Sequence, residues 1–265
     1  LPISGFDCIF MRANPPVDTT MLNFLDSVKD DVLIINDIDG IRKANNKLYT
    51  AAMFDGGAGI IPKTYVSKNK DYLQRIIKES EHDKMILKPL DGYGGSGVIV
   101  LEKKAAQSIS SLLDFYINGQ KEQKYVILQE YIEGAELGDV RILMLNGKPI
   151  GAMKRVPAEG DIRSNIHAGG REVKHQLTKT EKKICDLVGP KLVADGLYFV
   201  GLDVINGKLI EINVLSPGGI TRINRLNRVK LQQRVIDFVE DVVSIKEAAL
   251  NKKIANRLTV QNAKS

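Results

Sequence analysis

The sequence has 265 residues, 43% of them apolar, and a formal net charge of +6. This apolar content suffices for one large or two modest α/β domains and excludes a disordered or fibrous chain. No apolar run approaches the ~20 residues that span a bilayer, and no signal-peptide pattern opens the chain. Most of the positive charge lies after Ile245, so the body of the chain favours a small anionic ligand over nucleic acid or a membrane.

Strands and helices alternate in the first third of the chain. The predicted elements are, in order, a strand at 6–11, a helix from Asp18 to about Val28, a strand at 31–36, one helix from about Ile38 to Phe54, a strand at 61–66 and a helix around 72–77. Asp18 is suited to cap its helix, and the run DVLIIN is typical of a strand covered on both faces. The alternation predicts an α/β unit.

A glycine-rich loop lies between two further predicted strands. Met85 to Lys88 is a buried strand that ends in a lysine, Asp91 to Gly97 is the loop, and Val98 to Leu101 is the second strand. Neither a Walker A loop nor a dinucleotide-binding loop fits, because each would run into a helix. The pattern indicates either a flap that folds over phosphates, with Lys88 neutralising them, or a mobile surface hairpin.

The middle of the chain supplies a strand end and two arginines. Tyr125 to Ile132 predicts a strand whose last residues could hold a purine, although a plain core strand explains it equally well. A hairpin about Asn146-Gly147 carries Arg141 and Arg155. Their guanidinium groups match phosphate and carboxylate geometry, but arginine is more often simply exposed on the surface.

Residues 156–172 have neither a helical nor a strand period and predict a functional lid or disorder. The segment contains Arg163, Asn165 and His167, and Gly169-Gly170 could hinge it. His167 is expected to form hydrogen bonds in the lid, since no carboxylate partner that would make it a general base is evident. A helix at 180–194, bent at Pro190, follows this segment.

The hairpin at 201–214 turns at Asn206-Gly207. A two-residue loop would set Leu202 opposite Glu211, whereas a three-residue loop with Gly207 left-handed pairs Leu202 with Ile210. The second register is predicted because it gives one apolar face, made of Leu202, Val204, Ile210, Ile212 and Val214. It also gathers Asp203, Glu211 and Asn213 on the other face, where their oxygen atoms suit a hard cation such as Mg²⁺. The alternative is an ordinary polar outer face.

A long helix is predicted from about Asn227. Its apolar residues recur at spacings of four and three and form a seam that packs either on its own domain or on another subunit. The seam residues are Leu231, Val235, Phe238, Val242, Ile245 and Ala249. The tail beyond Asn256 is expected to be loose.

These elements together describe one site for a nucleoside triphosphate and Mg²⁺, and they carry a resemblance. From Asp7 to about Val243 the chain resembles bacterial-type glutathione synthetases of the ATP-grasp superfamily. The matching segments are MRANPP, NKLYTA, ILKPLDGYGG, GDVRIL, RVPAEGDIRSNIHAGGR and FVGLDVINGKLIEINVLSP. The resemblance implies an α/β (α+β) ATP-grasp fold and an ATP-dependent ligase that joins γ-glutamylcysteine to glycine through an acyl phosphate.

The resemblance also implies the site residues. Nucleotide contacts fall on Lys47, Lys88, Asp91, Gly92, Gly94, Gly95, Gln129, Glu130, Tyr131, Ile132 and Asp139. Catalytic arginines are Arg141, Arg155 and Arg163, and substrate contacts are Arg12, Asn165, Ser216, Pro217, Gly218 and Gly219. Asp203, Glu211 and Asn213 bind Mg²⁺, with Mn²⁺ as an alternative. Catalysis would rest on positioning and charge neutralisation in a closed site.

The implied organisation has three parts. Residues 1–45 are the remaining part of an N-terminal α/β substrate domain, since the chain opens on Leu1-Pro2 without the family's first strands and helices and is expected to be a truncated form. Residues 46–243 form the ATP-grasp domain, with a nucleotide-clasping lobe at 46–132 and a metal and substrate lobe at 133–243. A helical extension and tail occupy 244–265.

Three further expectations concern the chain as a whole. Cys8 and Cys185 lie far apart without metal-ligand spacing, which fits two free thiols in a reducing cytoplasm, and a homo-oligomer is expected from the family's habit and the helix seam. Gly218-Gly219 replace bulkier residues of the family, which leaves open another ATP-grasp ligase with different substrates. A non-catalytic ATP-binding regulatory protein is the other alternative.

Overall fold

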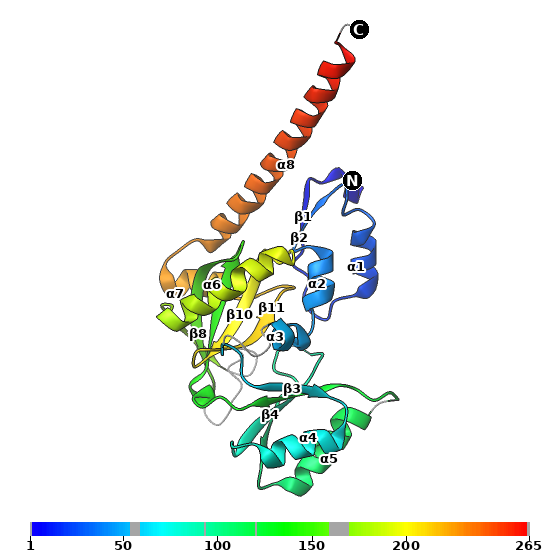
Figure 1. Ribbon diagram of the computed structural model, residues 1–265. Coiled ribbons are helices and arrows are strands. Elements are labelled where there is room, and N and C mark those ends of the chain that lie inside the picture. Colours follow the sequence, from blue (N-terminus) through cyan, green and yellow to red (C-terminus); the bar gives the residue numbers. More distant parts are fainter. Residues whose placement is uncertain (1, 54–58, 93, 120, 159–169, 264–265) are drawn as a thin grey trace.

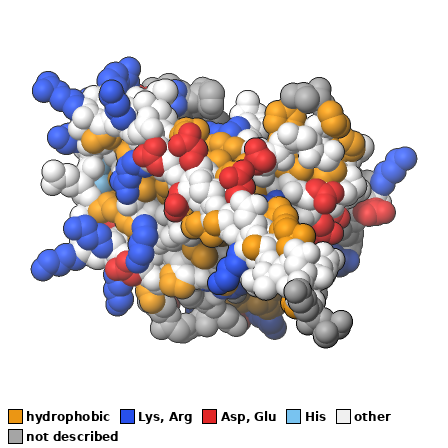
Figure 2. Space-filling model, turned by 90° about the horizontal axis from the view of Figure 1, so that it is seen from above, with side chains coloured by type: hydrophobic (Ala, Val, Ile, Leu, Met, Phe, Trp, Pro, Cys, Tyr) orange, Lys and Arg blue, Asp and Glu red, His pale blue; other side chains and the backbone are white. Residues whose placement is uncertain are grey.

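The computed structural model describes residues 2–53, 59–92, 94–119, 121–158 and 170–263. The chain is elongated, with three sheets in succession and one long helix that projects from the end nearest the N-terminus (Figure 1). Seen from that end, acidic and basic side chains share the surface with hydrophobic ones between them (Figure 2). No described helix is both long and apolar enough to cross a membrane.

The N-terminal part is a small α/β layer, as predicted. Strands β1 (Cys8–Phe10) and β2 (Leu33–Ile35) pair in parallel, and helix α1 (Thr19–Asp26) begins where the Asp18 carboxylate accepts from the Thr20 amide. A short 3-10 turn, η1 (Ile3–Gly5), precedes β1. The predicted helix over 38–54 is instead two helices, α2 (Ile38–Ala44) and α3 (Lys47–Met53). Asn46 interrupts it, because its side-chain oxygen accepts from the Leu48 amide at 2.9 Å and caps a new start.

The second layer is a four-stranded antiparallel sheet in the order β3-β6-β4-β5, with two helices on one face (Figure 1). Its strands are β3 (Thr64–Ser67), β4 (Lys84–Pro89), β5 (Ile99–Glu102) and β6 (Val126–Glu130), and its helices are α4 (Lys70–Glu79) and α5 (Ala106–Asn118). Leu73, Leu87, Leu113 and Leu128 form the core between sheet and helices. The opposite face carries Thr64, Lys88 and Gln129 and is therefore free to bind a ligand.

The third layer is a five-stranded sheet in the order β11-β10-β7-β8-β9. Its strands are β7 (Asp139–Leu145), β8 (Lys148–Val156), β9 (Arg171–Lys174), β10 (Phe199–Ile205) and β11 (Lys208–Asn213), and a 3-10 turn, η2 (Ala135–Leu137), precedes them. Helix α6 (Lys179–Ala194), which contains Pro190, packs on one face. On the other face, Leu143 and Phe199 lie under α7 (Ile220–Asn227) and the start of α8 (Leu231–Gln261). Farther along the same face the side chains become charged.

The β10–β11 hairpin confirms the shared face of the polar trio but not the predicted loop. Asn206 and Gly207 both have positive φ and form a two-residue turn. A β-bulge beyond it shifts the register, so that Leu202 pairs with Ile212 and Asp203 with Glu211. The prediction that Ile210 belongs to the apolar face is wrong. Because of the bulge, Leu209 packs in the apolar core in its place, and Ile210 points toward the cleft between the sheets.

Three other expectations need correction. No helix is predicted at 106–118, where α5 forms. The lid segment was expected to be irregular as far as Glu172, but Arg171 and Glu172 belong to β9 and pair with Val156 and Arg155. The last long helix begins at Leu231, since a separate helix precedes it, and it continues to Gln261 in place of a loose tail.

The α8 helix packs its apolar side chains on the protein through its first turns. Leu231 and Val235 are buried and Phe238 is half-buried against the core, whereas Ile245, Leu250 and Val260 are exposed. Beyond Val243 the described contact with the body is a hydrogen bond from Lys246 Nζ to the Asp31 carbonyl, 2.7 Å long and exposed. The second half of the helix therefore contributes little to the stability of one chain.

At a protein concentration where the chain is a monomer, a chain stopped after Val243 is expected to unfold within about 2 °C of the full chain, because exposed contacts rarely contribute more than ~0.5 kcal/mol. Differential scanning calorimetry would measure this. A stop after Arg234 is the matched control and should destabilise strongly, since it removes Val235 and Phe238. A large loss of stability in the longer variant would show that the distal half of α8 has a partner.

Candidate functional site

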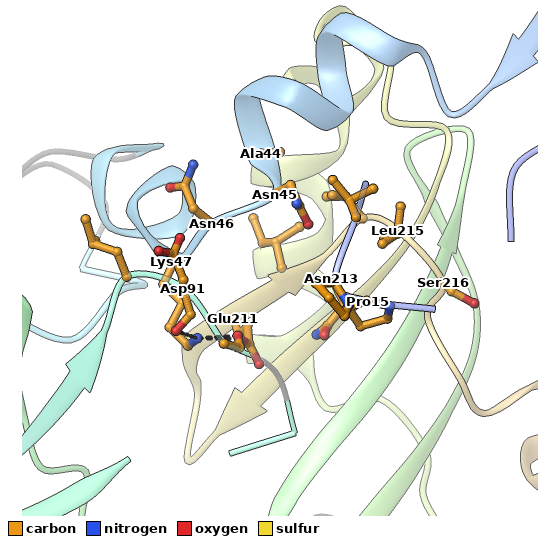
Figure 3. A pocket seen from close by; sticks show the side chains of 16 residues that line it. Pro15, Ala44, Asn45, Asn46, Lys47, Asp91, Glu211, Asn213, Leu215 and Ser216 are labelled. Atoms are coloured by element: carbon orange, nitrogen blue, oxygen red, sulfur yellow. Dashed lines mark hydrogen bonds and ion pairs between the residues drawn. The ribbon is translucent and has the colours of Figure 1, made fainter. Parts of the chain in front are cut away.

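The candidate site lies between the free face of the four-stranded sheet and the charged face of the five-stranded sheet. Two adjoining cavities of about 150 and 320 Å³ occupy this cleft, and Lys47 and Glu211 line both. The smaller one also touches Lys88, Gln129, Glu130, Tyr131, Ile132, Asp139, Arg155 and Asp203. The larger one also touches Asp91, Gly92, Asn213 and Ser216 (Figure 3). Most of the residues predicted from the sequence therefore gather around one space.

Two lysines point into this space from different elements. Lys88 lies near the end of β4 and donates from Nζ to Gln129 Oε1 at 2.6 Å. Burial lowers the pKa of Lys88 to about 8. Lys47 begins α3, and its Nζ lies 2.6 Å from the Gly92 carbonyl oxygen and 4.0 Å from Glu211 Oε1 (Figure 3). Burial also lowers the pKa of Lys47. Among the described residues, Glu211 is the nearest ion-pair partner of Lys47, at 4.0 Å, and no carboxylate lies within that distance of Lys88 Nζ. Both cations are therefore suited to an anionic ligand.

The glycine-rich loop closes one side of the larger cavity. Gly92, Gly94 and Gly95 all have positive φ, between 65° and 110°, which side-chain-bearing residues rarely adopt. The Tyr116 hydroxyl, on α5, donates to the Gly97 carbonyl at 2.9 Å and ties the loop to this helix. The loop therefore lies beside Lys47 and the cavity, as a flap would.

Two aspartates and two arginines form a buried charge network at the cleft floor. Arg141 donates to Asp203 through Nε at 2.5 Å and through Nη2 at 2.9 Å. Arg155 lies 3.0 Å from Asp203 through Nη2 and pairs bidentately with Asp139. Burial alone would raise the pKa of Asp203, but the two arginines outweigh it and hold this pKa below its ordinary value. The arginines predicted to meet substrate therefore also neutralise Asp139 and Asp203.

The predicted metal trio is assembled at the β10–β11 hairpin. Asp203 and Glu211 are directly opposite each other, and Asn213 Nδ2 donates to Asp203 Oδ2 at 3.1 Å. Burial, followed by the charge of Asp203, raises the pKa of Glu211. Among the described residues no three His, Cys, Asp or Glu side chains gather as a metal site, so the predicted donor set consists of two carboxylates and the amide oxygen of Asn213. An all-oxygen donor set of this kind fits Mg²⁺.

The end of β6 forms the wall of the smaller cavity. Gln129 directs its side chain to Lys88, while the Glu130 carboxylate lies 2.7 Å from His82 Nε2. The Tyr131 hydroxyl donates to Glu136 Oε2 at 3.2 Å. Ile132 lines the cavity together with Ile86, Ile205 and Ile210. The four isoleucines give this side of the cavity an apolar surface, which suits a flat aromatic ring.

The loop after β11 is held by two arginines. Arg12 donates from Nη2 to the Pro217 carbonyl at 3.2 Å, and Arg141 donates from Nη1 to the Gly218 carbonyl at 3.3 Å. Ser216 lines the larger cavity, and Gly219 precedes the first turn of α7. Arg163 and Asn165, as well as His167, lie outside the described residues.

Sequence reasoning missed two polar side chains near the site. Asn36 bonds to the Phe199 amide and carbonyl and to the Val214 carbonyl, all within 2.8 Å, and so links the outer ends of β10 and β11. The feature of the sequence that could have indicated Asn36 is a polar residue at the end of an apolar run. Thr64 bonds to Gln129 at 2.8 Å, and only the strand register could have revealed that contact.

Two sheets that enclose a cleft with a glycine flap define the class of protein. D-alanine–D-alanine ligase from Bacillus anthracis, solved with ATP, matches with a TM-score of 0.63 at 13% identity over 91% of this chain and 81% of that one. The ATP-grasp ligase PsnB, solved with a minimal precursor, Mg and ADP, matches with a TM-score of 0.61 at 15% identity over 90% of this chain and 78% of that one. The fold is ATP-grasp, as the sequence predicts.

Sequence comparisons then give the family. The family model for the ATP-grasp domain of prokaryotic glutathione synthetase matches residues 46–228, and that for its N-terminal domain matches residues 1–42. Glutathione synthetase from Thermosynechococcus vestitus is 40% identical over 242 residues, 90% of this chain and 73% of the relative. That from Gloeobacter violaceus is 38% identical over 247 residues, 90% of this chain and 74% of the relative. The chain belongs to the prokaryotic glutathione synthetase family.

Proposed function

We propose that this protein is an ATP- and Mg²⁺-dependent amide ligase that joins γ-glutamylcysteine to glycine. ATP phosphorylates the C-terminal carboxylate of the dipeptide, and the glycine amine attacks the acyl phosphate, so that glutathione, ADP and phosphate leave. The observation that carries the proposal is the gathering of Lys88, Lys47 and the acidic hairpin around one cleft. Family membership supports the choice of substrates.

Each part of the cleft has a role in this proposal. Residues 129–132 hold adenine against the isoleucines of the smaller cavity, while Lys47, Lys88 and the 91–95 flap hold the phosphates. Asp203, Glu211 and Asn213 would hold Mg²⁺, or Mn²⁺ in its place, and the ion would neutralise phosphate charge when bound. Arg141 and Arg155 lie beside this position, and their forks would steady the transferred phosphoryl group and the acyl phosphate.

The substrate end is proposed at Arg12 and the loop 216–219. The loop leads into α7, whose start has no side-chain cap within the described part of the chain, so its first amides could meet a carboxylate. Arg163 and Asn165 are proposed, on the resemblance alone, to close over the substrate. A β-carbon added to Gly218 would meet nothing within 4 Å, and this space supports a second candidate, a ligase of the same class that takes a bulkier amine.

The product decides between these candidates. The protein would be incubated with ATP, Mg²⁺, γ-glutamylcysteine and a panel of amines, and the products identified by mass, while phosphate release is followed with and without glycine. Glutathione is the expected product. Another amide without glutathione would favour the second candidate, and nucleotide binding without substrate-dependent phosphate release would favour a non-catalytic regulatory protein.

Affinity for ATP is expected to fall above about pH 8, because burial lowers the pKa of Lys88 to about 8. Below that pH the side chain is a cation that attracts phosphate, and above it the neutral amine does not. The loss can reach about tenfold per pH unit for one titrating group. The KM for ATP would be measured from neutral to alkaline pH. The Lys88→Met variant is the control and should lack this decline, whereas an equal decline in both would assign it to another group.

The remaining proposals concern organisation. We propose the three-part division at residues 45 and 243 given above, and a reducing cytoplasm as the compartment, which the free thiols of Cys8 and Cys185 support. A homo-oligomer is also proposed, supported by the exposed apolar residues of α8. Light scattering coupled to size-exclusion chromatography would measure its mass and would refute this last proposal by finding a monomer.

A further inference from the structure

The ammonium group of Lys88 stands at one end of a chain of three hydrogen bonds. Lys88 Nζ donates to Gln129 Oε1 at 2.6 Å, Gln129 Nε2 donates to Thr64 Oγ1 at 2.8 Å, and Thr64 Oγ1 donates to the Pro62 carbonyl at 2.7 Å. Strand pairing produces this row, since Thr64 and Gln129 are direct partners across β3 and β6. Lys88 lies two residues beyond Ile86, the partner of Gln129 on β4, and its side chain therefore shares their face.

The direction of the chain is set at both ends, because the Lys88 ammonium group can only donate and therefore faces the amide oxygen of Gln129. A carbonyl oxygen such as that of Pro62 can only accept, so it takes the single hydroxyl proton of Thr64. The Thr64 oxygen is then left as an acceptor, and the Gln129 amide has to turn its NH₂ group toward it. The amide oxygen consequently faces Lys88. No other orientation of Gln129 satisfies all three groups.

The direction of these hydrogen bonds matters because Lys88 is a buried cation with few polar partners. The residue is 8% exposed, and within the described ranges no carboxylate lies at ion-pair distance from its Nζ atom. The charges of Glu211 and Lys47 act on it from across the cleft. Without the Thr64 oxygen, the NH₂ group of Gln129 would have no acceptor at this place, and the amide would have to shift to find one. The ammonium group would then lose the amide oxygen in a poorly solvated place, which favours withdrawal of the lysine side chain or loss of its proton.

We propose that Thr64 is a positioning residue for the nucleotide: through Gln129 it keeps the Lys88 ammonium group charged and aimed into the cavity. The inference rests on the proposed function, since the ligand of Lys88 is taken to be a phosphate of ATP. Thr64 does not line either cavity of the site, and it therefore acts without touching the nucleotide.

The test compares Thr64→Val, which keeps the shape but removes the hydroxyl group, with Thr64→Ser, which keeps the hydroxyl group. Thr64→Val is expected to raise the KM for ATP about tenfold, the effect of one hydrogen bond to a charged group, with kcat changed less than about threefold. Its loss of ATP affinity should begin at a lower pH than in the wild type. Thr64→Ser should restore both properties. Equal defects in the two variants, or none in Thr64→Val, would overturn the inference.

A second background makes the test specific to the hydrogen-bond chain. In Gln129→Glu both side-chain oxygens accept, so the orientation of the group no longer depends on Thr64. Adding Thr64→Val to Gln129→Glu should therefore change the KM for ATP less than about twofold. The same tenfold effect in both backgrounds would mean that Thr64 acts by packing and would overturn the inference.

The failure of the two proposals can be told apart. If the wild-type protein forms no amide and binds no ATP by calorimetry, the proposed function fails. If the wild type is active and Thr64→Val, folded by circular dichroism, matches it in KM and pH profile, the proposed function stands and the inference fails. Thermal unfolding of each variant accompanies the kinetics, so that a loss of ATP affinity is not confused with a loss of fold.

Discussion

Replacing Asp203 by asparagine is expected to abolish ligase activity and to destabilise the fold, whereas replacing Glu211 by glutamine should abolish activity alone. Both changes remove one proposed metal ligand and convert an acid into its amide. They differ in the cations around them. Asp203 forms ion pairs with Arg141 and Arg155, with N–O distances of 3.0 Å or less. Glu211, in contrast, has only Lys47, at 4.0 Å, as an ion-pair partner among the described residues.

The stability difference follows from these partners. Asparagine at 203 leaves two buried guanidinium groups to share the single charge of Asp139, and breaking a buried ion pair costs about 3–5 kcal/mol. The arginines lower the pKa of Asp203, so its carboxylate stabilises the fold at neutral pH and loses this effect as the solution becomes strongly acidic. Burial and Asp203 raise the pKa of Glu211, so its ionised form opposes folding, and glutamine at 211 should leave the unfolding midpoint unchanged or higher.

The measurements are thermal unfolding and the glycine-dependent release of phosphate. Activity is expected to fall by about a thousandfold or more in both variants, because each removes a charge that neutralises the transferring phosphoryl group. Glu240→Gln, an exposed acid-to-amide change on α8, is the matched control and should alter neither. Retained activity in Glu211→Gln would remove this residue from the metal trio, and an unchanged midpoint in Asp203→Asn would refute the charge network.

The hairpin that carries these acids marks how far sequence reasoning reaches. Apolar alternation correctly predicts that Asp203, Glu211 and Asn213 share a face. It does so with the wrong loop, because a bulge supplies the extra residue that the argument assigns to the turn. The alternation of apolar residues shows that one extra residue lies between the two strands. It does not show whether that residue lies in the turn or in a bulge within a strand. The apolar lining that Ile210 provides therefore could not be predicted from spacing.

Motifs identify which residues bear the chemistry, and register decides their partners. The strand-loop-strand pattern predicts Lys88 and the glycine-rich loop as candidates, with a surface hairpin as the alternative, but the contacts of Asp203 with Arg141 come from pairing between β10 and β7, about sixty positions apart. Helix α5 is a different case. Its buried residues Ile109, Leu113 and Ile117 recur every four positions, so the signal was present and indicates an amphipathic helix.

Replacing Lys88 by methionine is expected to weaken ATP binding by about a hundredfold or more and yet to raise the unfolding temperature. The phosphate tail loses a buried charge-assisted contact, and such contacts cost about 2–5 kcal/mol when one partner is truncated. In the absence of ligand, however, the buried ammonium group destabilises the fold. Its pKa, lowered by burial to about 8, means that the charged form at neutral pH costs the fold on the order of 3 kcal/mol.

Methionine removes that cost and loses only the hydrogen bond to Gln129 Oε1, worth about 1 kcal/mol, so the net gain should raise the midpoint by a few degrees. Calorimetric unfolding with and without ATP would measure both effects, and ATP should stabilise the wild type but not the variant. Lys148→Met, an exposed change on β8, is the matched control and should move neither quantity. A lower midpoint in Lys88→Met would mean that a counter-charge already holds the lysine, and the cleft would then not be poised to receive a phosphate there.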